Sequence, residues 1–283
     1  MAGKHKNLNT KLFRLQKTFK GMGSVLIAYS GGVDSTFLLK VAADVLGKNV
    51  LAVTAASSTY PEREKKQAQM LAARLKVTHI TIVSEELSCR GFAENTKERC
   101  YWCKKELFAK LSQLAKKYKL RHIVDGATYD DINDYRPGMR AAQEMGVRSP
   151  LKDLKFRKDD IRYLSKQLGL TTWDKPSCAC LASRFPYGIG ITGDGLAMVE
   201  KAEDMVRRLG IKQVRVRHHG TIARIEVMAE DIGLLVSQRV RKKLISGLKD
   251  IGYVYVTLDM EGYRPGSMNE VLSKRKLQII SDK

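Results

Sequence analysis

The segment SGGVDS, residues 30–35, combines glycine, hydroxyl and carboxylate side chains in a pattern suited to phosphate chemistry. It follows an apolar run, residues 25–29, that predicts a buried strand, and precedes a run that predicts a helix over residues 36–46. Glycines let backbone amides approach an anion, which the helix dipole also favours. Asp34 would repel phosphate, so we expect it to bind Mg²⁺ or to fix the loop. The segment predicts a nucleotide site formed by Ser30, Gly31, Gly32, Asp34 and Ser35; the alternative is an ordinary glycine-rich turn.

The cysteines are the second group that could do chemistry. Cys100 and Cys103 form a CxxC pair, Cys178 and Cys180 form a CxC pair, and Cys89 stands alone. Three uses of these pairs remain open: a redox pair, a four-cysteine zinc site and an iron–sulfur cluster held by three thiolates. The structural alternative is that some of them are small buried residues, which we favour for Cys89.

Alternating strands and helices must position these residues. The pattern predicts strands over residues 49–55, 78–83 and 121–125, and helices over residues 60–75 and 104–120. This alternation indicates a doubly wound, mostly parallel sheet with helices on both faces. Ligands bind such sheets beyond the carboxyl ends of the strands. Ser57 and Gly126 fall at that edge, so we expect them to line the nucleotide site together with residues 30–35.

The chain changes character after residue 188. A predicted helix, residues 194–209, is followed by a hairpin over residues 213–227, a basic helix over residues 238–248 and a strand over residues 253–258. We therefore expect two domains: an α/β nucleotide-binding domain over residues 1–188, and a smaller α+β domain over residues 189–283 for substrate binding or oligomerisation.

Arginines of the second domain are candidates for a substrate phosphate. Arg215 and Arg217 lie two residues apart, hence on one face of their strand. Guanidinium groups bind phosphate with paired hydrogen bonds, and Arg184 is a further candidate. A solvated sheet face is the alternative for the arginine pair. Acidic residues before a predicted helix at residue 137 are expected to cap it, orient the loop or bind magnesium: Asp130, Asp131 and Asp134.

The composition limits the protein class. Lys and Arg number 51 against 30 Asp and Glu, a net charge of +21. This excess suggests a polyanionic partner, either RNA or a phosphorylated substrate, or simply a basic surface. The sequence has no apolar run of roughly 18 residues and no apolar signal core, so we expect a cytoplasmic protein without a membrane span, its cysteines reduced.

Several segments together resemble the LarE family of ATP-dependent sulfur transferases. They are SGGVDS, RCYWCKKELF, VDGATYDDINDYRPGMRAAQEMGVRSPL, KPSCACLASRFPYG and QVRVRHHGTIARIEV. The resemblance implies the fold of the PP-loop ATP pyrophosphatases, which cleave ATP between its α and β phosphates. It also implies the reaction: ATP and Mg²⁺ adenylate the carboxylates of pyridinium-3,5-biscarboxylic acid mononucleotide, and sulfur then displaces AMP. The thiocarboxylates formed belong to the nickel-pincer nucleotide cofactor.

The resemblance further implies roles for the cysteines. In some members a single cysteine, at the position of Cys180 here, gives up its sulfur and becomes dehydroalanine. Other members hold a 4Fe–4S cluster on three cysteines and transfer a further sulfide from its open iron. Because this chain carries a CxxC pair as well, it resembles the cluster type, with Cys100, Cys103 and Cys180 as ligands and with Cys180 and Asp34 as catalytic residues. Cys178 is an extra thiol that could replace Cys180 or complete a zinc site.

Partners follow from the same resemblance. We expect ATP and a small mononucleotide as ligands, and a homo-oligomer as the assembly. The alternative function is that of a PP-loop tRNA thiolase, which the net charge favours. We disfavour nucleic acid as the substrate because the sequence contains no recognisable RNA-binding module.

Overall fold

The computed structural model describes residues 2–133, 137–176 and 178–271 of the 283-residue chain. Its contacts divide the chain into two compact units. The first unit comprises residues 1–92 and 98–178, and the second comprises residues 93–97 and 179–283. The predicted domain boundary after residue 188 therefore lies inside the second unit, and the short segment 93–97 also joins that unit.

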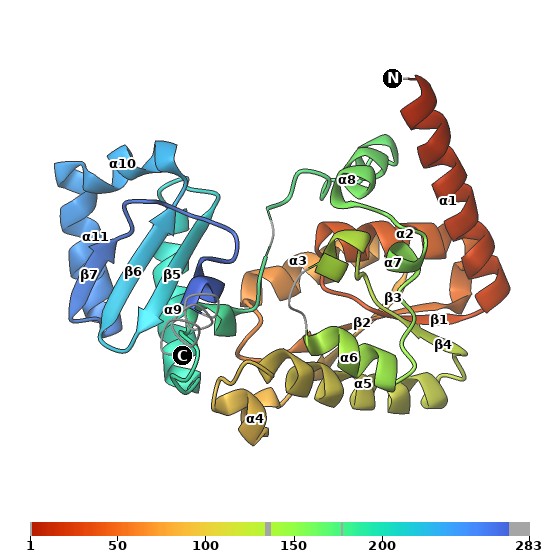
Figure 1. The fold of residues 1–283 in the computed structure, drawn as a ribbon, viewed down its shortest axis with the longest axis horizontal. Coiled ribbons are helices and arrows are strands. Elements are labelled where there is room, and N and C mark those ends of the chain that lie inside the picture. The colour runs from red at the N-terminus through yellow and green to blue at the C-terminus, as the bar shows by residue number, and fades with distance from the viewer. Residues whose placement is uncertain (1, 134–136, 177, 272–283) are drawn as a thin grey trace, which may run out of the picture. The chain divides into compact units, whose positions relative to one another are not determined.

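The first unit is built on sheet A, a four-stranded parallel sheet of order β3-β2-β1-β4. This topology confirms the predicted doubly wound α/β fold. Helices lie on both sides of the sheet, with α5 and α6 on one side and α1, α2, α7 and α8 on the other (Figure 1). In chain order its elements are α1 (Ala2–Met22), β1 (Val25–Ala28), α2 (Val33–Leu46), η1 (Gly47–Asn49), β2 (Val50–Ala56), α3 (Glu62–Arg74), β3 (Thr78–Val83), η2 (Glu86–Ser88), α4 (Arg90–Ala93), α5 (Arg99–Lys117), β4 (His122–Val124), η3 (Tyr129–Asn133), α6 (Pro137–Glu144), α7 (Pro150–Asp153) and α8 (Lys158–Gln167).

Apolar residues of the central strands are buried on both faces of sheet A. Val25 and Ile27 of β1 join the core beneath α1 and α2, whereas Leu26 joins the core beneath α5. Successive side chains of a strand point to opposite faces, so a continuous apolar run supplies two cores at once. This double burial holds the carboxyl end of β1, and the loop that follows it, in a rigid frame.

The second unit contains sheet B, of order β5-β6-β7. Strands β5 and β6 are antiparallel, β6 and β7 are parallel, and Val214, Val216 and Ile225 pack into the core shared with α9 and α11. The smaller α+β unit expected at the carboxyl end of the chain is thus present. Its elements are η4 (Leu181–Arg184), α9 (Gly193–Arg207), β5 (Val214–His219), β6 (Ile222–Val227), η5 (Ala229–Asp231), α10 (Ile232–Val236), α11 (Gln238–Ile251), β7 (Tyr255–Leu258) and η6 (Ser267–Asn269).

Helix α5 differs from its prediction in a way that matters for the cysteines. The sequence predicted a start at Lys104, but the helix begins at Arg99. The carbonyl of Glu98 accepts hydrogen bonds from the amides of Tyr101 and Trp102, which starts the helix five residues earlier. The CxxC pair is therefore helical instead of lying in a preceding loop.

None of the helices that the structure describes combines the length and the apolarity that a bilayer span requires.

Candidate functional site

The SGGVDS segment forms the tight connection between β1 and α2. Gly31 has a φ of +61°, and a Cβ there would lie 2.9 Å from the Cβ of Ala68 on α3. Both the left-handed backbone and the close approach of α3 therefore require glycine at this position. Gly32 is the extended residue that precedes the first turn of α2. The loop thus places the free amides of a helix N-terminus at the carboxyl edge of sheet A, the geometry that binds phosphate.

The two serines of the loop hold it closed. The hydroxyl oxygens of Ser30 and Ser35 are 3.0 Å apart, and the Ser35 hydroxyl also donates to the carbonyl of Gly32 at 3.3 Å. The amide of Ser30 donates to the Ser35 hydroxyl at 3.3 Å. The structure therefore brings Ser30, Gly32 and Ser35 together, with Asp34 in the first turn of α2.

Two residues that the sequence analysis did not assign fasten the loop from outside. The Tyr60 hydroxyl donates to the carbonyl of Ser30 at 2.5 Å, and the Lys175 ammonium donates to the carbonyl of Gly31 at 3.0 Å. Lys175 also forms an ion pair with Glu64 of α3, at 2.7 Å, in which both side chains are largely buried. With two successive carbonyls engaged by these donors, the loop is held in one conformation.

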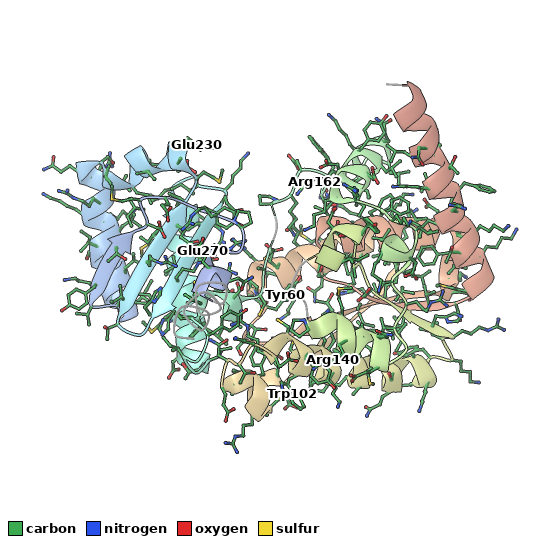
Figure 2. The ribbon with its side chains drawn as sticks, in the orientation of Figure 1. Tyr60, Trp102, Arg140, Arg162, Glu230 and Glu270 are labelled. Carbon is green, nitrogen blue, oxygen red and sulfur yellow. The ribbon has the colours of Figure 1, made fainter. Side chains whose placement is uncertain are left out.

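The environment of Tyr60 keeps its hydroxyl protonated. Burial raises its pKa well above the ordinary value, and the nearby charges of Glu64 and Cys178 add to this shift. A protonated hydroxyl remains a donor to Ser30. The same interaction locates Cys178, which the sequence did not place, in the neighbourhood of Tyr60, whose position in the structure is marked in Figure 2.

Other predicted ATP-binding residues lie at the same sheet edge. A Cβ on Gly126 would lie 3.2 Å from the amide nitrogen of Ser35, so this glycine allows the loop after β4 to touch the start of α2. Beside it, the Asp125 carboxylate accepts a hydrogen bond from the Ser149 hydroxyl at 2.7 Å. The Ser57 hydroxyl donates to Glu86 at 2.5 Å. Topology alone predicted this grouping, whereas the buried carboxylate of Glu86 was not anticipated.

The predicted acidic cluster near residue 137 is organised differently from expectation. Asp130 accepts a hydrogen bond from the amide of Lys158, the first residue of α8, at 2.7 Å. Asp131 accepts from the amide of Thr128 at 2.8 Å. Asp130 therefore caps α8 and Asp131 orients its own loop, while Asp134 lies outside the described residues.

The CxxC pair occupies the first turn of α5. Cys100 is exposed and Cys103 is half-buried, and neither forms a disulfide. Residues three apart lie on the same side of a helix, so the two sulfurs face one region. The Trp102 indole packs on the backbone of Gly91, where a Cβ would meet the ring. On α6, Arg140 lies over the Tyr101 ring at 4.3 Å; Trp102 and Arg140 are labelled in Figure 2.

The other two cysteines fall on either side of the division between the units. Cys178 ends the range of the first unit, and Cys180 lies in the second, directly before η4. Both are exposed, and neither forms a disulfide. Within residues 2–133, 137–176 and 178–271, no three His, Cys, Asp or Glu side chains come together as a metal site. The predicted ligand set of Cys100, Cys103 and Cys180 therefore draws on both units.

Arg184 is completely buried and organises the turn that carries Cys180. Its Nη1 donates to the carbonyl of Cys180 at 3.0 Å, and its Nε pairs with Glu203 of α9 at 2.7 Å. Arg207 pairs with the same carboxylate at 2.7 Å. Burial alone would raise the pKa of Glu203, but the two guanidinium groups outweigh it and lower that pKa to about 2. Glu203 is therefore a buried anion between two cations.

Arg215 and Arg217 lie on one face of sheet B, as predicted, but that face is buried. Arg217 pairs with the buried Glu226 at 2.6 Å, and donates to the carbonyl of Ser183 at 3.2 Å. Its Nε is buried without a hydrogen-bond partner. Arg215 lies over the ring of Tyr263 at 5.3 Å. The expectation of a solvated arginine face, which was the alternative, is therefore wrong, because these side chains are almost wholly removed from water.

Comparisons with known proteins agree with this arrangement. Residues 10–112, which include the phosphate loop, match the NAD synthase family. The chain is 44% identical to an uncharacterized protein of Synechocystis, over 94% of this chain and 100% of the relative. It is 41% identical to the pyridinium-3,5-bisthiocarboxylic acid mononucleotide synthase of Lactiplantibacillus plantarum, over 97% of this chain and 99% of that enzyme. A more distant similarity, 24% over about half of each chain, links it to one subunit of the glutamine-hydrolyzing GMP synthase of Archaeoglobus fulgidus. Because the similarity to the Lactiplantibacillus synthase covers nearly both full lengths, this chain belongs to the LarE family of PP-loop enzymes, as its motifs predicted.

Proposed function

We propose that this protein is an ATP-dependent sulfur transferase that converts the carboxylates of pyridinium-3,5-biscarboxylic acid mononucleotide into thiocarboxylates. The supporting observation is the geometry of residues 30–35 at the carboxyl edge of sheet A, in a chain 41% identical to a synthase named for the bisthiocarboxylic product. The alternative, a PP-loop tRNA thiolase, has no comparable support.

The first step activates a carboxylate. One carboxylate oxygen of the substrate attacks the α-phosphorus of ATP, the bond to the bridging oxygen breaks, and pyrophosphate leaves. In our proposal Ser30, Gly31, Gly32 and Ser35 bind the pyrophosphate, and Asp34 acts through Mg²⁺. Ser57 and Gly126 complete the nucleotide site. Fixed amides suit this task because they stabilise the developing negative charge without reorganising.

The second step replaces AMP with sulfur. A sulfur nucleophile attacks the acyl carbon, the bond to the AMP oxygen breaks, and a thiocarboxylate remains. We propose that Cys100, Cys103 and Cys180 hold a 4Fe–4S cluster, which when bound supplies this sulfur. The support is chemical: cysteine thiolates are donors that iron prefers, none of these three cysteines forms a disulfide, and two of them share one side of α5.

The arginines of the second unit are proposed to serve the substrate phosphate. The partnerless Nε of Arg217 leaves one buried donor available to an anion, and Arg215 lies on the same face. Arg184 already donates to Cys180 and Glu203, so we assign it first to positioning the Cys180 turn.

The test is release of pyrophosphate from Mg·ATP that depends on pyridinium-3,5-biscarboxylic acid mononucleotide. We expect release with this substrate and none with bulk tRNA in its place. An Asp34→Ala variant should fold normally, because Asp34 lies outside the core, in the first turn of α2. The same variant should release no pyrophosphate. Release that depends on tRNA alone, or equal release by the variant, would overturn the proposed function.

A further inference from the structure

The amino edge of sheet A, opposite to the phosphate loop, carries a feature that sulfur transfer does not use. Four connections gather there because each precedes a strand of the same parallel sheet: residues 20–24, 47–49, 75–77 and 116–121. In Figure 1 this is the edge at which α1 ends and β1 and β4 begin. Three of the connections, residues 20–24, 47–49 and 116–121, line a cavity of about 450 Å³ together with the first residues of β2 and β3.

The charge of this edge is entirely positive. The four connections contain no Asp or Glu. None of their cations is ion-paired to a carboxylate in the part of the chain that the structure describes, and all of them are exposed: Lys20, Lys48, Lys76, Lys116, Lys117, Lys119 and Arg121. We call this set the amino-edge cations. Like charges that crowd together without counter-charges repel, so the surface favours an anion.

Helix dipoles explain only part of the set. Lys20, Lys116 and Lys117 occupy the last turns of α1 and α5, where cations stabilise a helix. The three that line the cavity lie beyond the ends of the α-helices: Lys48, Lys119 and Arg121.

Two of the lysines are kept at a conformational cost. Lys76 and Lys119 have φ values of +55° and +54°, and each lies two residues after the last residue of a helix, α3 or α5. Glycine is the usual residue there because a Cβ is strained in the left-handed region. The lysine side chain, and not the backbone, is therefore the feature that requires an explanation.

The electrostatic effect reaches the neighbouring strand. The pKa of His122, the first residue of β4, is lowered by burial and further by the charges of Arg148 and Arg121. Of these causes, only Arg121 belongs to the amino-edge cations.

We propose that the amino-edge cations and Tyr118 form a binding surface for a single strand of RNA. The cavity is of nucleotide size, and the ring of Tyr118 at its rim is 45% exposed, as a stacking platform for a base requires. Cations on both sides of the cavity exceed what one phosphate group needs and match a phosphodiester backbone. Four loops that are far apart in the sequence form the surface, so no RNA-binding motif marks it. The proposal goes beyond the proposed function and does not depend on it.

The first test measures anisotropy of a fluorescein-labelled oligouridylate of about 16 nucleotides. The variant Lys48→Gln/Lys119→Gln/Arg121→Gln should bind at least tenfold more weakly. The slope of log K against log[salt] should fall by about 2, since three contacts contribute about 0.7 each. The control Lys201→Gln/Arg239→Gln/Lys242→Gln removes equal charge from exposed positions of the second unit, and should keep the wild-type slope. Equal loss in both variants would overturn the proposal.

A second test separates binding from folding. Lys119→Gly removes a side chain from a residue with a φ of +54°. The matched control is Lys155→Gly, at a φ of +57°. Lys155 lies beyond the opposite edge of the sheet, where the carbonyl of the next residue, Phe156, accepts a hydrogen bond from the amide of Tyr129. Both should keep or raise the melting temperature, because glycine relieves the strain. Only Lys119→Gly should weaken RNA binding. Similarly, Tyr118→Ala should weaken RNA binding, whereas the control Tyr255→Ala should leave RNA binding unchanged.

Competition identifies the ligand class. Excess Mg·ATP should not displace the oligonucleotide, and polyglutamate should displace it much less effectively than unlabelled oligouridylate. Displacement by Mg·ATP would place the binding at the phosphate loop, and equal displacement by polyglutamate would indicate an acidic protein partner. Either result overturns the proposal, while failure of the pyrophosphate assay would leave it untouched.

Discussion

At the scale of single residues, the phosphate loop depends on side chains that come from elsewhere in the chain. Tyr60 and Lys175 donate to the carbonyls of Ser30 and Gly31. A carbonyl that is held by a donor fixes the peptide plane, and hence the direction of the amide on the same plane. Lys175 also lies three residues before Cys178, so it joins the phosphate loop to the cysteine-bearing segment.

We predict that Lys175→Met lowers substrate-dependent pyrophosphate release by about a hundredfold, the usual effect of a misplaced catalytic loop. It should also destabilise the protein by about 3 kcal/mol, because the buried Glu64 loses its closer partner and keeps only the ion pair with Arg63 at 3.4 Å. Steady-state kinetics and urea unfolding measure the two effects.

The double variant Glu64→Leu/Lys175→Met separates the loss of activity from the loss of stability. Removing both charges should restore most of the stability but none of the activity. Recovered activity would show that Lys175 serves only to neutralise Glu64.

The substrate phosphate gives a second prediction at this scale. Arg217→Lys keeps a positive charge beside Glu226 but loses the Nε donor and the planar fork. We expect KM for the phosphorylated mononucleotide to rise about tenfold or more, with ATP binding unchanged. The dephosphorylated nucleoside is the control, because its KM should respond little to the substitution. An equal effect on both substrates would contradict the assigned role.

Glu203 makes the second unit sensitive to acid. Its folded-state pKa of about 2 lies below the ordinary 4.5, so its stabilisation is complete above pH 4.5 and is lost as pH falls from there toward 2. The loss is on the order of 3 kcal/mol. Glu203→Gln should be less stable at neutral pH and lack this dependence, as followed by urea unfolding with far-UV circular dichroism. An unchanged pH dependence in the variant would show that Glu203 is not the cause of the acid sensitivity.

At the scale of elements, one buried residue holds the segment that follows the Cys180 turn. Asn95 is fully buried with φ +53°, and its amide nitrogen donates to the carbonyls of Pro186 at 2.7 Å and Ile189 at 2.9 Å. Its own carbonyl accepts from Gly188. The short segment before α5, which carries the CxxC pair, is thereby fastened to the segment after Cys180.

We predict that Asn95→Ala destabilises the second unit by about 1–3 kcal/mol, since the carbonyls of Pro186 and Ile189 both lose their donor. It should also lower thiocarboxylate formation more than pyrophosphate release, because the phosphate loop lies in the first unit. Both products are measured in one reaction by liquid chromatography. An equal fractional loss of thiocarboxylate formation and pyrophosphate release would show that Asn95 affects only the stability of the whole protein.

At the scale of the whole molecule, the source of sulfur distinguishes two proteins with the same fold. If Cys180 gives up its own sulfur, its Cβ–Sγ bond breaks with loss of the Cα proton, and dehydroalanine remains. If sulfur comes from a cluster on Cys100, Cys103 and Cys180, the polypeptide survives each turnover. We predict an unchanged polypeptide mass after turnover by anaerobically prepared protein, together with iron and sulfide.

Intact-protein mass spectrometry and metal analysis decide between these outcomes. Loss of the mass of one H₂S, with full activity in a Cys100→Ala/Cys103→Ala variant, would establish the sacrificial route. Zinc in place of iron would make the cysteines structural.

The sequence alone determined the α/β framework and the phosphate loop. Both are local: an apolar run buried on two faces predicts a parallel strand, and SGGVDS specifies a strand–turn–helix within one short segment. The edge strand β3, although only half-buried, also has its predicted bounds, Thr78–Val83. Topology then grouped Ser57 and Gly126 with the loop, since the carboxyl ends of parallel strands share one edge.

Only the tertiary structure decided which side chains support that loop and which arginines are buried. Lys175 and Gly31 are far apart in sequence, as are Arg217 and Ser183, and no local pattern encodes such pairs. The sequence showed that Arg215 and Arg217 share a face, but periodicity cannot tell a solvated face from one covered by the later segment that contains Tyr263 and Ser267. The start of α5 was missed because Glu98 caps it through backbone contacts that residue type does not reveal.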